Sequence, residues 1–231
     1  MKFLTIFWAM VITVASVHAQ TADEIIAKHI DAIGGRDKLA GLKSVSQESS
    51  TEIMGNSTTI SEVLVEGKGY RSESEYNGNK IIQCITDKGG WMINPLMGTS
   101  DAQVLPDEAW QSAKASIYFE GALNNYAAQG FNASLEGVEE GSYKIKIHST
   151  VDMYYFIDTK TFYLVKTIVK GEMMGQQIDI TTAYSDFKKT DFGLVFPYTK
   201  DINMGMFQMT QKTDKLEINK DIDLNTFEMP K

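Results

Sequence analysis

Apolar and polar residues alternate at the period of a β-strand over most of the chain. In residues 142–149, aromatic and isoleucine side chains at odd positions alternate with lysine and histidine at even positions, which predicts a strand with one solvated face. Turn sequences divide residues 44–94, which are rich in β-branched residues, at 54–57, 67–69, 77–79 and 87–90. The pattern predicts four strands before Lys88, a fifth from Trp91 and about six more from Phe131.

Two segments carry the period of helices instead. The first begins where Thr21 and Glu24 have the spacing of a capping box, and a pair of glycines ends it. The second, residues 106–129, opens with a proline and two acids. We expect Gly121 to break or kink this helical insertion before a further helical piece that continues to Tyr126.

The order of these elements predicts the fold class. Ten or eleven sequential antiparallel strands must curl or close on themselves. The helical insertion lies halfway along the chain and is too short for a core of its own, so we expect it to lie on the sheet or inside its curve. The predicted class is α+β, mainly antiparallel β.

Two strand segments are apolar on both faces. Residues 154–166 place Tyr or Phe at even and odd positions alike, and residues 203–209 do the same with methionine and phenylalanine. An antiparallel sheet with one wet face should alternate apolar and polar residues, so something must cover the second face. Methionine is common at surfaces that accept varied apolar ligands, but it also fills ordinary cores.

The covering group is either a tightly packed helix or a ligand in an apolar cavity, and the pattern leaves both open. If it is a ligand, we expect eight apolar side chains to bind it: Trp91, Trp110, Ile117, Phe156, Phe162, Leu164, Met204 and Met206.

The N-terminal residues and the composition limit the cellular compartment and the kinds of partner that we expect. Lys2, a short apolar run and the small residue Ala19 predict a signal peptide over residues 1–19, cleaved after Ala19. Residues 20–231 then form a single domain that is exported and does not span a membrane. The net charge of −8 makes nucleic acid a poor partner. Cys84 is the single cysteine, so an intrachain disulfide is excluded. We expect its side chain to be buried as a small hydrophobic group.

We find no pattern that predicts catalysis. His29 and His148 are the only histidines after the signal peptide, and neither lies in a hydrolase or metal-binding motif. Residues 221–225 resemble the start of a calcium loop but lack its glycine and its closing glutamate. We therefore expect no enzyme, no metal site and no cofactor, and assign no catalytic residue.

Three segments in order resemble the LolA/LolB superfamily of lipoprotein carriers: FIDTKTFYL at 156–164, TDFGLVFP at 190–197 and LEINKDIDLNTFEMP at 216–230. The resemblance covers most of residues 22–230. It implies an incompletely closed β-barrel whose concave face is covered by helices, with a hydrophobic cavity for acyl chains. These carriers are associated with an arginine that ties the sheet to the lid, and Arg71 is the better positional match of the chain's two arginines.

The resemblance implies a periplasmic carrier that reversibly buries lipid acyl chains or a lipidated protein, as in the sorting of outer-membrane lipoproteins. Because an apolar lining is all that such binding needs, a carrier need leave no catalytic signature. The alternative is an interaction module of the same fold, with an envelope protein as its partner, which senses envelope stress or scaffolds a complex without lipid cargo.

Overall fold

A single antiparallel sheet dominates the computed structural model, which describes residues 20–53, 56–95, 98–149, 151–173, 176–205 and 207–230. The predicted signal peptide lies outside the described residues. The sheet has 13 strands. They are β1 (Ser44–Ile53), β2 (Asn56–Val65), β3 (Gly69–Tyr76), β4 (Asn79–Thr86), β5 (Gly90–Asn94), β6 (Thr99–Val104), β7 (Asn132–Glu139), β8 (Ser142–His148), β9 (Asp152–Asp158), β10 (Leu164–Met173), β11 (Gln176–Lys189), β12 (Val195–Met204) and β13 (Phe207–Ile218).

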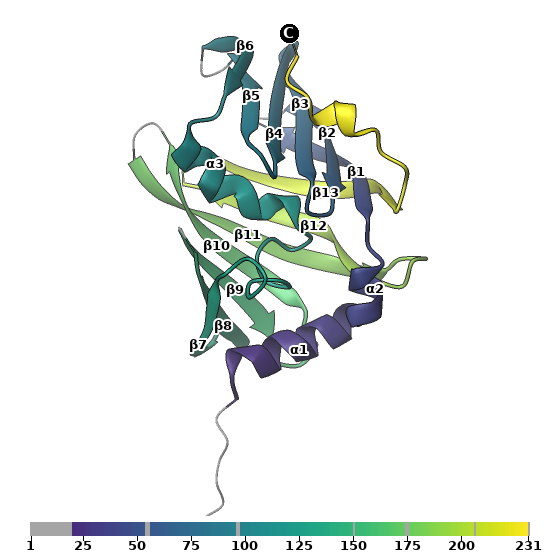
Figure 1. Ribbon diagram of the computed structural model, residues 1–231, viewed down its shortest axis with the longest axis vertical. Helices are drawn as coiled ribbons and strands as arrows, with labels where there is room; N and C mark the ends of the chain where they lie inside the picture. The colour runs from purple at the N-terminus through teal and green to yellow at the C-terminus, as the bar shows by residue number, and fades with distance from the viewer. Residues whose placement is uncertain are drawn as a thin grey trace, which may run out of the picture.

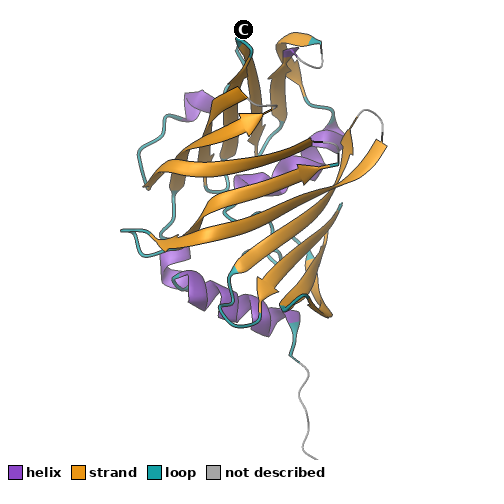
Figure 2. Cartoon of the chain, turned by 180° about the vertical axis from the view of Figure 1, so that it is seen from behind, coloured by secondary structure: helices purple, strands orange, loops and turns teal. Residues whose placement is uncertain are grey.

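The sheet curves without closing. Its order is β6-β5-β4-β3-β2-β1-β13-β12-β11-β10-β9-β8-β7, so β6 and β7 form the two edges. The connection between them, which we call the lid segment (residues 105–131), must pass from one edge to the other. It does so across the concave side, as Figure 1 shows, while the strands fan across the opposite face (Figure 2). The predicted fold class and open, curved barrel are confirmed.

The sheet has two more strands than the upper predicted number. The polar strand β6 was not expected, and seven strands follow the lid segment where about six were predicted. Gly205, with a φ of 72°, turns the chain between β12 and β13. The predicted strand segment 203–209 is therefore split between β12 and β13.

Helix α1 (Ala22–Ile33) begins and ends as predicted. Thr21 and Glu24 form both bonds of a capping box, and Gly34 caps the other end at a φ of 137°. The short helix α2 (Arg36–Ala40) follows. In Figure 1, α1 lies across one end of the curved sheet.

The lid segment is less helical than predicted. It contains α3 (Asp107–Ala113) and the 3-10 helix η2 (Lys114–Ile117), and turns follow in place of the further helical piece expected to continue to Tyr126. The helical path ends at the extended Tyr118, and Glu120 and Gly121 follow with positive φ values of 57° and 65°. In the described residues, no helix is long and apolar enough to span a bilayer.

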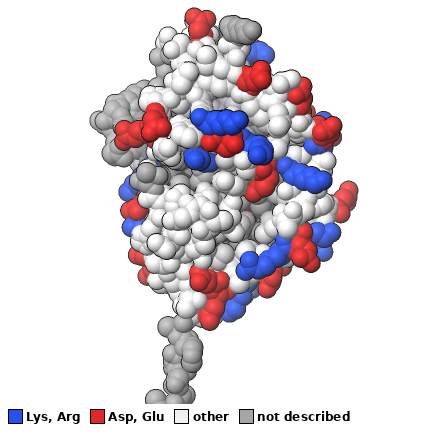
Figure 3. All heavy atoms as spheres, in the orientation of Figure 1, with Lys and Arg blue, Asp and Glu red and all other residues white. Residues whose placement is uncertain are grey.

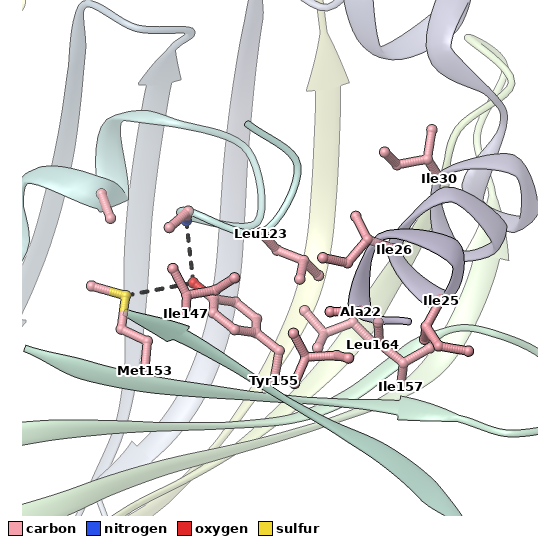
Figure 4. Packing of buried hydrophobic residues seen from close by; sticks show 13 residues of the cluster. Ala22, Ile25, Ile26, Ile30, Leu123, Ile147, Met153, Tyr155, Ile157 and Leu164 are labelled. Carbon is pink, nitrogen blue, oxygen red and sulfur yellow. Dashed lines mark hydrogen bonds between the residues drawn. The ribbon is translucent and has the colours of Figure 1, made fainter. Parts of the chain in front are cut away.

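The main core joins α1 and the lid segment to β8, β9 and β10. Figure 4 shows Ile26 of α1 and Leu123 of the lid segment pointing toward Tyr155 and Leu164 of the sheet. The Tyr155 hydroxyl accepts a bond from the Ala122 amide at 3.1 Å and so fixes the lid to β9. This core holds one end of the concave face closed.

The C-terminal segment packs against the opposite face of the sheet. The 3-10 helix η3 (Leu224–Phe227) places Phe227 in a cluster with Ile82, Cys84 and Trp91. The Phe227 carbonyl accepts bonds from the Trp91 indole at 2.9 Å and from the Cys84 thiol at 3.3 Å. Cys84 is fully buried, as expected, and burial raises the pKa of its thiol to about 11.

Candidate functional site: a cavity under the lid segment

A cavity of about 390 Å³ lies between the concave face and the lid segment. Its volume is within the range of small-molecule sites. One part of its wall is apolar and comes from the lid segment, β9, β10, β12, the start of β1 and the end of β2. The apolar lining residues are Val45, Leu64, Ala113, Ala115, Phe119, Met153, Leu164, Val169 and Phe196.

Another part of the wall carries polar and charged side chains, Glu62 of β2, Tyr70 of β3 and Lys200 of β12, and Gln211 of β13 bonds to Glu62 behind them. The Glu62 carboxylate accepts bonds from the Tyr70 hydroxyl at 2.6 Å, from the Gln211 amide at 2.6 Å and from the Lys200 ammonium at 3.1 Å. The side chains of Glu62 and Lys200 are only 15% and 20% exposed. We call these four residues the Glu62 cluster.

The contacts determine the protonation states in the Glu62 cluster. Burial by itself favours the neutral acid, but Lys200, Tyr70 and Gln211 outweigh it and lower the pKa of the Glu62 carboxyl. Burial and the nearby carboxylate raise the pKa of Tyr70 well above its ordinary value. Glu62 is therefore a carboxylate and Tyr70 a neutral phenol that donates to it.

A second buried ion pair ties the lid segment to α1. His29 is fully buried, and its Nε2 lies 2.8 Å from the Glu120 carboxylate, which lines the cavity. Its Nδ1 lies 2.8 Å from the carbonyl of Phe162 in the turn between β9 and β10. Asn124 donates a further bond to Glu120 at 2.8 Å. The lid segment is thus held to two elements at this end of the cavity.

Of the eight residues predicted to bind a ligand, Leu164 lines the cavity. Ile117 lies in η2 of the lid segment and is fully buried, and its neighbours Ala115 and Ser116 contribute to the cavity wall. Trp110 lies in α3, where its indole donates to the carbonyl of Thr86 at 3.0 Å. Trp110 and Ile117 thus belong to the lid segment without being among the residues that line the cavity.

Trp91 and Phe156 belong to the outer face of the sheet. Trp91 packs against Phe227 of the C-terminal segment. Phe156 is only 1% exposed because lysine side chains cover it, with the Lys166 and Lys144 ammonium groups 4.1 and 5.6 Å from its ring centre. Lysine side chains thus cover one apolar face of residues 154–158, and the main core covers the other.

Phe162 and Met204 lie near the ends of strands. Phe162 stacks on Tyr143 with ring centres 6.1 Å apart, beside α1. Met204 shares a strand face with Lys200 near the end of β12, and Met206 lies outside the described residues. Direct contact of the eight residues with a ligand stays a prediction, which the position of Leu164 supports.

Arg71 does not make the predicted contact with the lid among the residues that the structure describes. It pairs with Cys84 across β3 and β4, on the face opposite Tyr70, and its guanidinium lies 2.5 Å from the Glu73 carboxylate. Strand alternation explains the difference, because neighbouring residues point to opposite faces. Glu120 and His29 make the tie between the lid segment and the rest of the fold instead.

The Glu62 cluster was not predicted from the sequence. A signal existed in β1, the strand SVSQESSTEI, whose inward odd positions after Val45 carry Gln47, Ser49 and Thr51, all buried. A central strand with buried polar residues indicates a polar interior. Glu62 on β2 and Lys200 on β12 are far apart in sequence, so their ion pair could not be identified from the spacing of residues.

On the face that carries α1 and α3, acidic and basic residues are interspersed, and uncharged residues cover the turns that follow η2 (Figure 3). This mixed pattern does not select ligands by charge at long range. In the described part of the chain, no group of three or more His, Cys, Asp or Glu side chains is placed to hold a metal ion.

The open curved sheet and the lid segment over an amphipathic cavity define a LolA-like fold. Solved structures of this fold are similar over nearly the whole chain. An outer membrane lipoprotein-sorting protein domain from Vibrio parahaemolyticus has a TM-score of 0.58 at 10% identity, covering 89% of this chain and 97% of that one. A LolA superfamily protein from Nitrosomonas europaea has a TM-score of 0.58 at 12% identity, covering 91% and 98%.

A DUF1329 family protein from Desulfovibrio piger is also similar, with a TM-score of 0.53 at 10% identity, covering 91% of this chain and 98% of that one. No protein-family model and no curated protein matches the sequence. At these identities the likeness establishes the fold.

Proposed function

We propose that this protein is a periplasmic binding protein that reversibly holds the acyl chain of a lipid or a lipidated protein under its lid segment. The observation that carries the proposal is the cavity of about 390 Å³, whose apolar wall joins the lid segment to β9 and β10. The names of the similar solved structures, which include lipoprotein sorting, support the same class of ligand.

The energetics of acyl burial fit reversible binding. Burying about ten methylene groups at ~0.8 kcal/mol each yields roughly 8 kcal/mol before the cost of association. That cost is at least about 4 kcal/mol. The remaining gain is favourable but small enough for release, as a carrier requires, and the proposed role is therefore binding without a chemical step.

The test uses two neighbouring residues of β10 that face opposite sides. Val169 lines the cavity, whereas Ile168 pairs with Tyr154 on the outer face. Val169→Trp should fill the cavity and weaken binding of the apolar fluorescent probe N-phenyl-1-naphthylamine by about tenfold or more, a loss of at least ~1.4 kcal/mol. Ile168→Trp is the matched control and should bind the probe as the wild type does.

Native mass spectrometry of the protein recovered from the periplasm should in addition detect a bound lipid. Absence of both lipid and probe binding in the wild type would refute the proposal. Recovery of a protein partner without lipid would favour the interaction module, for which an envelope partner stays a prediction.

A further inference from the structure

The Glu62 cluster lies on the wall of a cavity that is otherwise apolar enough for an acyl chain. Two of its members, Glu62 and Lys200, are oppositely charged, and both line the cavity. A buried ion pair is not needed to close a sheet, because apolar residues of similar size usually serve as well. Its position on the cavity wall therefore suggests a role toward whatever enters the cavity.

The hydrogen bonds of the Glu62 cluster are unevenly satisfied. The Glu62 carboxylate receives three donors, from Tyr70, Gln211 and Lys200. The Lys200 ammonium has three N–H donors. Throughout the described ranges, Glu62 is the one acceptor found within hydrogen-bond distance of it. Lys200 thus retains donor capacity beside the cavity, whereas Glu62 is well supplied.

Charge balance then selects the kind of acceptor that suits Lys200. A ligand carboxylate or phosphate would place a second negative charge beside Glu62, where burial penalises an uncompensated charge. An alkane would leave the spare N–H groups of Lys200 without a partner. An uncharged oxygen acceptor satisfies the donors and keeps the ion pair neutral.

The cavity also fixes where that acceptor sits on the ligand. The apolar wall at Met153, Leu164 and Val169 comes from β9 and β10, and the Glu62 cluster comes from β2, β3, β12 and β13. Gln83 lines the cavity on β4 and is exposed, so the polar side meets solvent. An amphiphile would lie with its tail toward β9 and β10 and its polar group at Lys200.

We propose that the cavity selects acyl esters or acyl amides, whose uncharged carbonyl oxygen accepts a hydrogen bond from Lys200, over free fatty acids and alkanes. This proposal rests on the proposed function, since it names the class of acyl compound that the same cavity takes. An ester points to a lipid and an amide to an N-acylated protein, and the shared chemistry is the neutral acyl carbonyl.

The test is displacement of N-phenyl-1-naphthylamine by four compounds of one chain length: a monoacylglycerol, an N-acyl glycinamide, the fatty acid and the alkane. At pH 7.5 we expect the ester or the amide to displace the probe at concentrations about tenfold lower than the fatty acid and the alkane require. Tighter binding of the ester would indicate a lipid as the natural ligand, and tighter binding of the amide would indicate an N-acylated protein.

The double variant Glu62→Gln/Lys200→Met removes both charges together, so that neither is left buried alone. Measured relative to its own affinity for the probe, it should lose the roughly tenfold preference for the carbonyl compounds. Lys212→Met is the control, because Lys212 is exposed on the neighbouring strand β13. It should keep the preference.

The possible failures are distinguishable. If the wild type does not bind the probe, the proposed function fails. If it binds the probe but takes the fatty acid as well as the ester and the amide, or if the double variant keeps the preference, the inference about Lys200 is overturned while the carrier function stands. If the double variant fails to fold, the preference of the wild type among the four compounds still decides.

Discussion

His29 shows how one buried side chain holds three segments together. Its two ring nitrogens each face an oxygen acceptor, the Glu120 carboxylate and the Phe162 carbonyl, both at 2.8 Å. Two acceptors require two N–H donors, so this environment favours the imidazolium form. Burial disfavours the charge, but Glu120 and Phe162 outweigh it, and the pKa of His29 is raised above 6.5.

The raised pKa of His29 predicts how stability depends on pH. The contribution of this group is fully present below the unfolded value of 6.5 and is lost as pH rises through the higher folded value. The free energy of unfolding should therefore fall between pH 6 and pH 8.5. His29→Gln should lose about 1–3 kcal/mol at pH 6 and less at pH 8.5. Urea denaturation at several pH values measures both effects.

His148 offers a matched control for this prediction. It is the other histidine after the predicted signal peptide and is exposed on β8, where it lies 2.9 Å from the Ser134 hydroxyl. His148→Gln should keep the pH dependence of the wild type. A His29→Gln variant whose stability falls with pH as steeply as that of the wild type would show that another group is responsible.

Strands with one wet face, and helices with a cap, were predicted well from the sequence. The capping box of α1 and the alternation in β8 are local features, and the structure has both. The lid segment was harder, because the positive φ values of Glu120 and Gly121 are held by contacts with Tyr155 and His29 that are distant in sequence. Local propensity could not supply those contacts.

Which side chains of β9 and β10 face the cavity was even harder to predict from the sequence. A bulge between Leu164 and Lys166 reverses the alternation of β10, so Leu164 faces the cavity while Lys166 covers Phe156 on the outer face. One inserted residue shifts every following side chain to the other face. Phe156 and Leu164, both predicted to bind a ligand, thus lie on opposite sides of the sheet.

The C-terminal segment depends on a glycine in β3, which can be tested directly. A Cβ atom on Gly69 would lie 2.9 Å from the ring of Phe227, so Gly69→Ala must displace the segment that covers Trp91 and Cys84. We expect a loss of about 1–3 kcal/mol in the free energy of unfolding. Denaturant unfolding followed by Trp fluorescence measures it.

A nearby glycine serves as the control for that substitution. A Cβ atom on Gly89 would meet nothing within 4 Å, and its φ is not in the left-handed region. Gly89→Ala should leave stability unchanged or raise it slightly. Equal losses in the two variants would contradict a specific role for the contact between Gly69 and Phe227.

At the scale of the whole molecule, the position of the cavity would couple binding of a ligand to folding. The main core joins α1, the lid segment and the sheet, and the cavity lies against the same residues, with Tyr155, Leu164 and Met153 belonging to both. The sheet has two open edges, at β6 and β7, and the lid segment connects them. A ligand in the cavity therefore contacts parts of the chain that unfolding would separate.

This coupling predicts that the probe stabilises the protein. At a free concentration of 100 times its dissociation constant, N-phenyl-1-naphthylamine should add about 2.7 kcal/mol to the free energy of unfolding. For a domain of this size that corresponds to a rise of roughly 5–10 °C in Tm. Differential scanning calorimetry should detect the full rise in the wild type and in Ile168→Trp, but at most about half of it in Val169→Trp, whose affinity for the probe is lower by about tenfold or more. A similar rise in all three proteins would place the bound probe outside the cavity. Of the two substituted residues, Val169 lines the cavity and Ile168 does not.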